Sequence, residues 1–454
     1  MAAVEVLERF VKRDPLAVMS RAVAVGMLDE RLDDIFEQQR SQQYERTLKL
    51  SLLARTMTEV ALGFVDNRHQ AYREFKDELQ VSAVAYYGKL NRTEPAVSEG
   101  VVSHVAQQSQ KLLDALRFQP WEPLRGYRCL TIDGNHLQQT EKRLKETRGL
   151  CAAPLPGTVV ARFDHQTGLF DRAYLLEDAH AQESSVLDRA AADFGPRDLV
   201  IADRHFCIVR FLLQVAARCG CFVIRQHGRL KGTPVGQRRR VGRIASGVVY
   251  EQQLDVSTGE DLFIVRRITV ELDQPTRDGE TEIHVLSNVS PDDADACELA
   301  DLYRQRWEIE NAFHVLTMTL TCEVNSICHP RCALFLFCLA LCAYNCRQVV
   351  LAGLYAEHPT EEVDRMSHFH MALDLHRPQA GMETAITPEE WFHLVPRDTT
   401  TLAHFLRRTA RHVDVGFYRK STRGPKKPPA TRKRCKAGTH VSTAKLLSTR
   451  FKRC

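Results

Sequence analysis

Residues 127–133 read Tyr127-Arg-Cys-Leu-Thr-Ile-Asp133, and residues 198–203 read Asp198-Leu-Val-Ile-Ala-Asp203. Each stretch is short, rich in apolar residues and closed by an aspartate, which is typical of a strand buried inside an α/β protein. Gly134 follows the first stretch and predicts a turn at that point. These two segments decide the fold, because they predict two strands of a central sheet.

The neighbouring segments supply the rest of that sheet. Thr158–Asp164, Leu169–Leu176 and Cys221–Gln226 are predicted strands, while Glu183–Phe194 and Phe206–Arg218 are predicted helices. The resulting order is β-β-β-α-β-α-β. Three antiparallel strands followed by parallel crossovers predict an α/β fold with a ribonuclease H-like mixed sheet.

The flanking regions differ in their patterning. Helix-like apolar spacing from Pro15 to Gln119 predicts an all-α N-terminal region. Asp292–Leu320 predicts one long helix. A β-rich insertion with strands at Val248–Leu254, Leu262–Leu272 and Glu282–Val289 precedes it. We therefore expect five parts: a helical region at 1–120, a core at 121–226 and 290–350, a β-rich insertion at 227–289, a helical region at 351–418, and a disordered basic tail at 419–454.

Charge is distributed unevenly along the 454 residues. The net charge is +5, but residues 419–454 contain 13 Lys and Arg and no Asp or Glu, which leaves a net charge of −8 on the remainder. A basic tail on an acidic body suggests a polyanionic partner. With 44% hydrophobic and 26% charged residues, the chain has the composition of a folded protein, and wholesale disorder is excluded.

Targeting features point to the cytosol. The longest apolar run, Cys332–Tyr344, is too short to span a bilayer, so we expect a buried helix and no membrane partner. Glu5, Glu8 and Lys12 interrupt any signal-peptide pattern. The 14 cysteines are scattered without the spacing of a disulfide scaffold, which is typical of a reducing compartment.

Carboxylates occupy positions where chemistry is expected. In the predicted sheet the strands that end at Asp133 and Asp203 lie side by side, so the two carboxylates converge at the edge where α/β proteins place their ligands. Carboxylate oxygens are the ligands that Mg²⁺ prefers. Taken alone, an aspartate at a strand end is usually only a turn former.

The predicted helix at 292–320 offers a third carboxylate. At about 100° per residue, one polar stripe collects several functional side chains: Tyr303, Arg306, Glu310, His314 and Thr317. Glu308 lies far from that stripe and is expected to be solvated. An Arg306–Glu310 pair alone would be an ordinary surface ion pair.

Three motifs together resemble a known family. Tyr-x2-Arg-x3-Glu at Tyr303, Arg306 and Glu310 resembles the signature of the insertion-sequence-four family of DDE transposases. Thr-Ile-Asp-Gly-Asn-His-Leu around Asp133 and Ile-Ala-Asp-Arg-His-Phe around Asp203 resemble its first and second acidic motifs. The β-rich segment before the Glu helix also fits, and the resemblance covers about residues 120–350. Several motifs in order are more specific than any one alone.

The resemblance implies a DNA transposase of a mobile insertion sequence, acting by cut-and-paste transposition. Asp133, Asp203 and Glu310 would be the catalytic, metal-binding residues for two Mg²⁺ ions, with Mn²⁺ as a substitute. The DNA-binding residues would be Tyr303, Arg306, Arg204, His205 and His314. The implied partners are double-stranded DNA, as transposon ends and target, and a second copy of the chain on paired ends. The implied location is the bacterial cytoplasm, at the nucleoid.

The sequence departs from the family pattern at two places. Thr317 stands where the family has a Lys that contacts a DNA-end phosphate, which puts that contact and a hairpin intermediate in doubt; His314 on the same face is a weak substitute. Some relatives hold a flipped base with a Trp in the insertion, and this insertion has none. Tyr250 or Phe263 can stack a base instead, although ordinary strand packing explains both.

Other readings remain open on the sequence. One is an inactive or domesticated transposase that only binds DNA, and another is a metal-dependent nuclease without strand transfer. A zinc module at Cys322-x5-Cys328-His329-x2-Cys332 lacks the usual paired ligand spacing. Buried free thiols account for these cysteines more simply.

Overall fold

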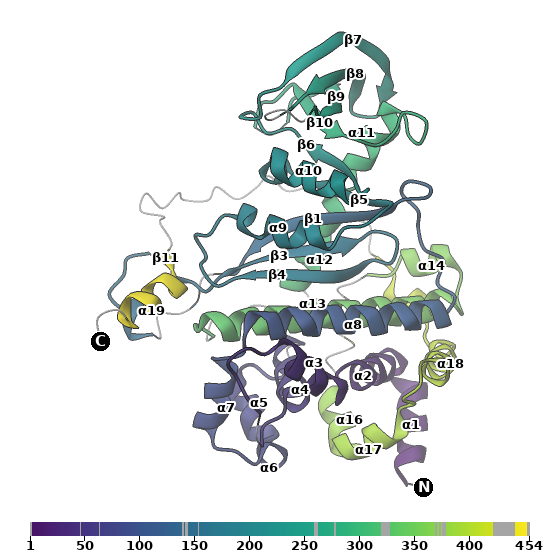
Figure 1. The fold of residues 1–454 in the computed structure, drawn as a ribbon. Coiled ribbons are helices and arrows are strands. Elements are labelled where there is room, and N and C mark those ends of the chain that lie inside the picture. Colours follow the sequence, from purple (N-terminus) through teal and green to yellow (C-terminus); the bar gives the residue numbers. More distant parts are fainter. Residues whose placement is uncertain are drawn as a thin grey trace.

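The computed structural model describes residues 2–451 except 46, 63, 139, 141–143, 153, 258–261, 277, 319–326, 368–369, 372–373, 375–377 and 421–440. Its centre is a nine-stranded mixed sheet with the strand order β4-β3-β1-β5-β6-β10-β9-β8-β7 (Figure 1). The strands of this sheet are β1 (Arg128–His136), β3 (Thr158–Asp164), β4 (Leu169–Leu176), β5 (Asp198–Ala202), β6 (Cys221–Arg225), β7 (Thr233–Ile244), β8 (Gly247–Asp255), β9 (Ile264–Leu272) and β10 (Glu282–Ser287).

The first five strands have the predicted arrangement. β3 pairs antiparallel with both β1 and β4, while β5 runs parallel to β1 and to β6. This mixed sheet, together with the helical N-terminal region, confirms the predicted α/β ribonuclease H-like fold class. One detail of the prediction is wrong: β1 does not end in a turn at Gly134. Pairing with β3 continues as far as His136, opposite Thr158, so Gly134 lies inside the strand.

The β-rich segment continues the central sheet. β10 pairs antiparallel with β6, and β9, β8 and β7 follow outward from it. The strands predicted from Val248, Leu262 and Glu282 are therefore present as β8, β9 and β10. The outermost strand, β7, was not predicted, because it is exposed on nearly every residue and its run of Arg238, Arg239 and Arg240 shows no apolar alternation. Charged side chains of this kind are common on edge strands.

Two long helices cover one face of the sheet. α8 (Pro95–Ala115) and α13 (Pro330–Tyr355) run side by side along it (Figure 1). Alternate residues of β3 and β4, among them Ala161, Phe163 and Phe170, point into the same apolar cluster as the two helices. The period of two residues in a strand explains why Val159, Ala161 and Phe163 of β3 join this cluster while the residues between them do not.

The opposite face is covered by shorter elements. These are the 3₁₀ turn η2 (Glu183–Val186), the helix α9 (Leu187–Ala192), the 3₁₀ turn η3 (Arg204–Phe206) and the helix α10 (Val209–Ala217). Leu130 and Ile132 of β1 pack into their apolar cluster. Cys129, from the other face of β1, packs with α11 (Ala296–Arg304) instead. The single predicted helix at Glu183–Phe194 is thus divided between η2 and α9.

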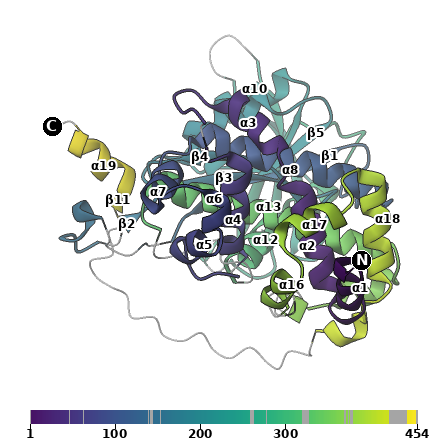
Figure 2. The same ribbon diagram turned by 90° about the horizontal axis from the view of Figure 1, so that it is seen from below.

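The N-terminal region is helical, as predicted. Its elements are α1 (Ala2–Arg13), α2 (Pro15–Met27), α3 (Arg31–Gln39), α4 (Leu50–Ala61), α5 (Arg68–Glu74), α6 (Lys76–Leu79) and α7 (Ala83–Leu90), followed by α8. They lie on the side of α8 and α13 that faces away from the sheet (Figure 1). Three C-terminal helices pack among them, as Figure 2 shows from below: α16 (Gln379–Ala385), α17 (Pro388–Leu394) and α18 (Thr399–Ala410). A fourth, α14 (Thr360–Asp364), packs against α13.

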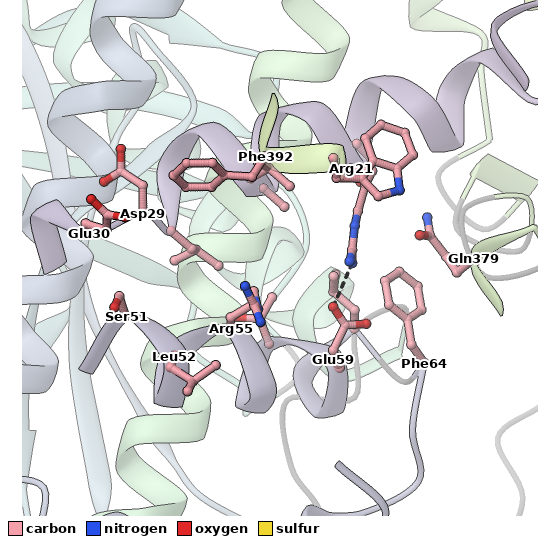
Figure 3. Close-up of a pocket in the computed structure, with 17 residues that line it drawn as sticks. Arg21, Asp29, Glu30, Ser51, Leu52, Arg55, Glu59, Phe64, Gln379 and Phe392 are labelled. Atoms are coloured by element: carbon pink, nitrogen blue, oxygen red, sulfur yellow. Dashed lines mark hydrogen bonds and ion pairs between the residues drawn. The ribbon is translucent and has the colours of Figure 1, made fainter. Parts of the chain in front are cut away.

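A cavity of about 190 Å³ lies between these two groups of helices. Arg21 of α2 and Glu59 of α4 form a buried ion pair of 2.7 Å beside it, and Phe392 of α17 lines it from the C-terminal side (Figure 3). The pair joins two helices through a charge-assisted hydrogen bond, which is stronger than a neutral one. Helices far apart in the sequence therefore share one interior.

The structure differs from the sequence prediction in the basic tail. Residues 421–440 lie outside the described part of the chain. Residues 441–451, predicted to be disordered, form the strand β11 (Val441–Ser442) and the helix α19 (Thr443–Phe451). β11 pairs with the short strand β2 (Pro154–Leu155), and Lys445 binds Asp178 at 2.8 Å. The residues that β11 and Lys445 contact lie far away in the sequence, so the Gly and Pro residues of the tail could not indicate this structure.

The apolar run at Cys332–Tyr344 lies inside the 26-residue helix α13, twice as long as the run itself. By length and composition alone α13 is long and apolar enough to cross a membrane, but 94% of its apolar window is buried inside the protein. Cys338, Cys342 and Cys346 lie in this buried helix as free thiols, as do Cys328 and Cys332 at its start. Cys322 lies outside the described residues.

Shortening a buried side chain of α13 should destabilise the whole protein. Leu339 is fully buried between the sheet and the N-terminal helices, so Leu339→Ala should cost about 2–5 kcal/mol through lost burial and the cavity it leaves. Thermal unfolding should show a lower midpoint for this variant. Val84→Ala, at a side chain that is 81% exposed, is the control and should leave the midpoint nearly unchanged.

Candidate active site at one edge of the sheet

Two aspartates meet because their strands are parallel and adjacent. In the β1–β5 pair, Ile132 lies opposite Ala202, so Asp133 and Asp203 are the next residues of the two strands. Asp133 is still within β1, whereas Asp203 begins the turn η3, where its Oδ1 accepts a hydrogen bond from the His205 amide at 2.7 Å. The predicted convergence of the two carboxylates at this edge therefore agrees with the observed register.

The third carboxylate comes from a helix that is broken in two. The predicted single helix over Asp292–Leu320 is wrong: α11 ends at Arg304 and α12 (Trp307–Met318) begins three residues later, at Trp307. The Asp295 side chain and Glu298 form a capping box at the start of α11, which explains why the helix begins there. Between the helices the Arg306 amide donates to the Tyr303 carbonyl, the shorter spacing of a 3₁₀ turn.

Arg306 joins two of the carboxylates from this break. Its Nη1 lies 3.2 Å from Asp133 Oδ2, and its Nη2 lies 2.7 Å from Glu310 Oε1. The guanidinium is only 13% exposed, so both ion pairs are shielded from water. The ordinary i,i+4 pair expected from the sequence is thus one half of a bridge between β1 and α12.

The pKa of Asp133 reflects first its burial and then the charges around it. Burial raises the pKa of Asp133 to about 7, the Arg306 guanidinium opposes the shift, and the carboxylates of Asp203 and Glu183 add to it. The single positive charge of Arg306 therefore does not offset the effect of burial and of the neighbouring carboxylates on the pKa of Asp133. A pKa perturbed by burial and by specific charges in a cleft is typical of a functional site.

The expected DNA-contacting residues surround the carboxylates. Arg204 is 45% exposed and lies 3.5 Å from Glu280, while His205 is 62% exposed beside Asp203. Burial raises the pKa of Tyr303 in α11, with Arg306 and Arg225 acting in the opposite direction. His314 is exposed on α12. Thr317 lies in α12 as well, but its side chain is outside the described set.

Several residues of this site were missed by the sequence reasoning. Glu308, expected to be solvated, accepts a 2.9 Å hydrogen bond from Nδ1 of His165, whose Nε2 lies 2.6 Å from Thr131 Oγ1 of β1. These two hydrogen bonds connect α12 to β1, the strand that carries Asp133. Glu183 of η2 was also missed, although a Gly directly after Asp133 inside a strand was a signal of close approach by another group.

A groove adjoins the carboxylates on the η3 side. Its volume is about 600 Å³, and basic or imidazole side chains contribute much of its lining: His136, Arg204, His205, His227 and Arg229. Glu183 lines it too. From Arg204 to Tyr250 the sequence has no Asp or Glu. The groove therefore offers positive charge next to a cluster of negative charge.

The two aromatic residues considered for base stacking are engaged elsewhere. Arg238 lies over the ring of Tyr250, with its guanidinium carbon 4.1 Å from the ring centroid. Phe263 packs against Phe222, at 6.3 Å between centroids. Both contacts are of the ordinary packing kind.

The side chains present suit a hard cation in their chemistry. Asp133, Asp203 and Glu310 offer only carboxylate oxygens, the ligand type that Mg²⁺ prefers. In the described part of the chain, no three His, Cys, Asp or Glu side chains stand close enough to hold an ion directly. Arg306 accounts for part of this, because it occupies the space between two of the carboxylates. Mg²⁺ usually retains several waters, so an open arrangement is compatible with it.

Replacing Asp133 should stabilise the metal-free protein in a pH-dependent way. Its pKa in the folded state, about 7, lies above the ordinary value of 3.8, so the folded state binds more protons between these values and loses stability as pH rises through them. The difference corresponds to at most about 4 kcal/mol. Thermal midpoints in EDTA should show a larger gain for Asp133→Asn at pH 8 than at pH 5; an equal gain at both would contradict this.

Comparisons with known proteins identify a family and a solved structure to which the chain is similar. Residues 125–346 match the family described as Transposase DDE domain. No curated protein matches the chain. Among solved structures, the chain is similar to the cryo-EM structure of a piggyBac transposase synaptic complex with hairpin DNA, with a TM-score of 0.41, 11% identity, and coverage of 92% of this chain and 87% of that chain. The narrower insertion-sequence-four family stays a prediction. Residues 125–346, which contain Asp133, Asp203 and Glu310, are thus identified as similar to transposase DDE domains.

Proposed function

We propose that this protein is a DNA transposase that cuts the ends of an insertion sequence and joins them to target DNA. The observations that support the proposal are the adjacent positions of Asp133 and Asp203 on parallel strands and the bridge of Arg306 between Asp133 and Glu310, within the segment that matches the DDE domain. A protein that cuts DNA by the same chemistry but does not join the ends to target DNA would be a nuclease. A protein that has lost the cutting activity would be a DNA-binding protein only.

Different residues of the site would bind the metal ions and the phosphate during phosphoryl transfer. Two Mg²⁺ ions, or Mn²⁺ in their place, would activate the attacking oxygen and stabilise the leaving one. Asp133, Asp203 and Glu310 would hold these ions. Arg306 has a planar guanidinium suited to bidentate contact with a phosphate, and a cation arriving between Asp133 and Glu310 would free it for that contact. Tyr303 supplies a hydroxyl from the same break.

The groove beside the site gives the DNA a path. Arg204, His205 and Arg229 line it, and phosphate oxygens bind such side chains whatever the base sequence. We propose double-stranded DNA, as element ends and target, as the partner, with two copies of the chain on paired ends and a hairpin intermediate on the route. The bacterial cytoplasm, at the nucleoid, is the location we propose.

Removing any one of the three carboxylates should abolish strand cleavage. Asp133→Asn, Asp203→Asn and Glu310→Gln should each lower the rate on element-end DNA by on the order of 1,000-fold, because bound metal supplies several kcal/mol of charge stabilisation. The measurement is cleavage by purified protein in Mg²⁺, resolved on denaturing gels. Asp188→Asn is the control, since Asp188 is exposed and pairs only with groups on α10.

The outcomes of that assay distinguish a transposase from an inactive DNA-binding protein and from a nuclease. Intact cleavage in any of the three variants would refute the assignment of that residue. A wild-type protein that binds DNA and never cuts it would favour the inactive reading. Cut ends without joined products in the presence of target DNA would favour a nuclease.

The basic tail should contribute sequence-independent attraction to DNA. Changing six of its basic residues to Gln leaves β11 and α19 intact: Lys426, Lys427, Arg432, Lys433, Arg434 and Lys436. Each lost phosphate contact should reduce the slope of log K against log salt by about 0.9. Fluorescence anisotropy across a salt series measures this slope, and an unchanged slope would rule out the tail's role.

A further inference from the structure

A fourth carboxylate lies beside the three of the proposed triad. Glu183 begins η2, the 3₁₀ turn that follows β4 along the chain and lies near η3. Its side chain lies directly against the backbone of β1. A Cβ atom at residue 134 would be 1.8 Å from Glu183 Oε1 and 2.4 Å from its Cδ. A side chain at position 134 would therefore displace the Glu183 carboxylate, which is the flexible end of its side chain, from its place against β1.

This position is close to both aspartates. The negative charge of Asp203 raises the pKa of Glu183, and the negative charge of Glu183 raises the pKa of Asp133. His205, which is itself 62% exposed, acts in the opposite direction on the pKa of Glu183. Across the described residues, no hydrogen bond or ion pair is found for the Glu183 carboxylate. A half-buried carboxylate among like charges is costly unless a cation binds it.

Charge balance gives an independent reason for a fourth carboxylate. Asp133, Asp203 and Glu310 with the guanidinium of Arg306 carry a formal charge of −2, which balances one divalent cation. Phosphoryl transfer of the proposed kind uses two. Glu183 brings the formal charge to −3.

We propose that Glu183 belongs to the metal centre of this protein and holds the divalent cation nearest Asp203 through that cation's coordinated waters. The inference rests on the proposed function. Binding through water agrees with the absence, among the described residues, of three metal-ligating side chains in direct reach of one ion. Mg²⁺ and Mn²⁺ retain waters readily, and carboxylates that hydrogen-bond to metal-bound groups tune the affinity of a site.

The competing explanation is a purely structural Glu183 that supports the start of η2. The two explanations differ in what removal of the charge does without metal. A structural residue contributes to stability, so Glu183→Gln would lower the thermal midpoint in EDTA. A residue held among like charges for a cation is relieved by the same change, so the midpoint would stay or rise.

Binding of Mn²⁺ to the full-length, metal-free protein tests the proposal without any DNA or catalysis. Electron paramagnetic resonance of free Mn²⁺ gives the number of bound ions and their affinities. Glu183→Gln should weaken the weaker of two Mn²⁺ sites by about tenfold or more. Gly134→Ala displaces the carboxylate while keeping it in the chain, and should weaken the same site. Asp188→Asn removes one carboxylate from neighbouring α9 and should leave both sites unchanged.

The outcomes separate this inference from the proposed function. Unchanged Mn²⁺ affinity in Glu183→Gln, with Asp133→Asn and Asp203→Asn both impaired, overturns the role of Glu183 and leaves the triad standing. Unchanged affinity in all of these variants, or a wild-type protein that binds no Mn²⁺, overturns both. Loss of affinity in Glu183→Gln accompanied by a lower midpoint in EDTA also counts against the proposal, because it indicates a structural role.

Discussion

The constraint on which the site depends is the parallel pairing of β1 with β5. Parallel strands end at the same edge, and the register Ile132–Ala202 brings Asp133 and Asp203 together there. Two carboxylates so placed repel each other, and burial increases the cost. The surrounding elements are arranged around this unfavourable charge, and the fold can tolerate it because the sheet is fixed by apolar clusters on both faces.

Two contacts fix the third carboxylate relative to the first. Arg306 bridges Asp133 and Glu310 from the break between α11 and α12, and Glu308 binds His165, which in turn contacts Thr131 of β1. Both contacts join α12 to the same strand. The break in the helix is what allows Arg306 to turn back toward β1 while Glu310 remains on α12. The guanidinium thus provides in the metal-free protein a part of the positive charge that the carboxylates require.

How far the sequence predicts each element depends on whether its cause is local. β3 and β4 were predicted with their observed ends, because apolar patterning and a Gly-containing turn at Gly168 mark them. β7 escaped prediction since its exposed arginines carry no such pattern, and its pairing with β8 decides its structure. The helix break at Arg306 and the docking of β11 on β2 likewise follow from partners distant in the chain.

The sequence by itself predicted β1, β3, β4, β5 and β6 in their order, and it singled out three carboxylates and the arginine that accompanies them, because periodicity and motif spacing are properties of neighbouring residues. Only the tertiary structure decided what these groups meet. Gly134 looked like a turn, yet it is the place where Glu183 approaches β1; Glu308 looked solvated, yet it binds His165. Such contacts depend on which surfaces the packed sheet and helices bring within a few ångströms, and no spacing along the chain encodes that distance.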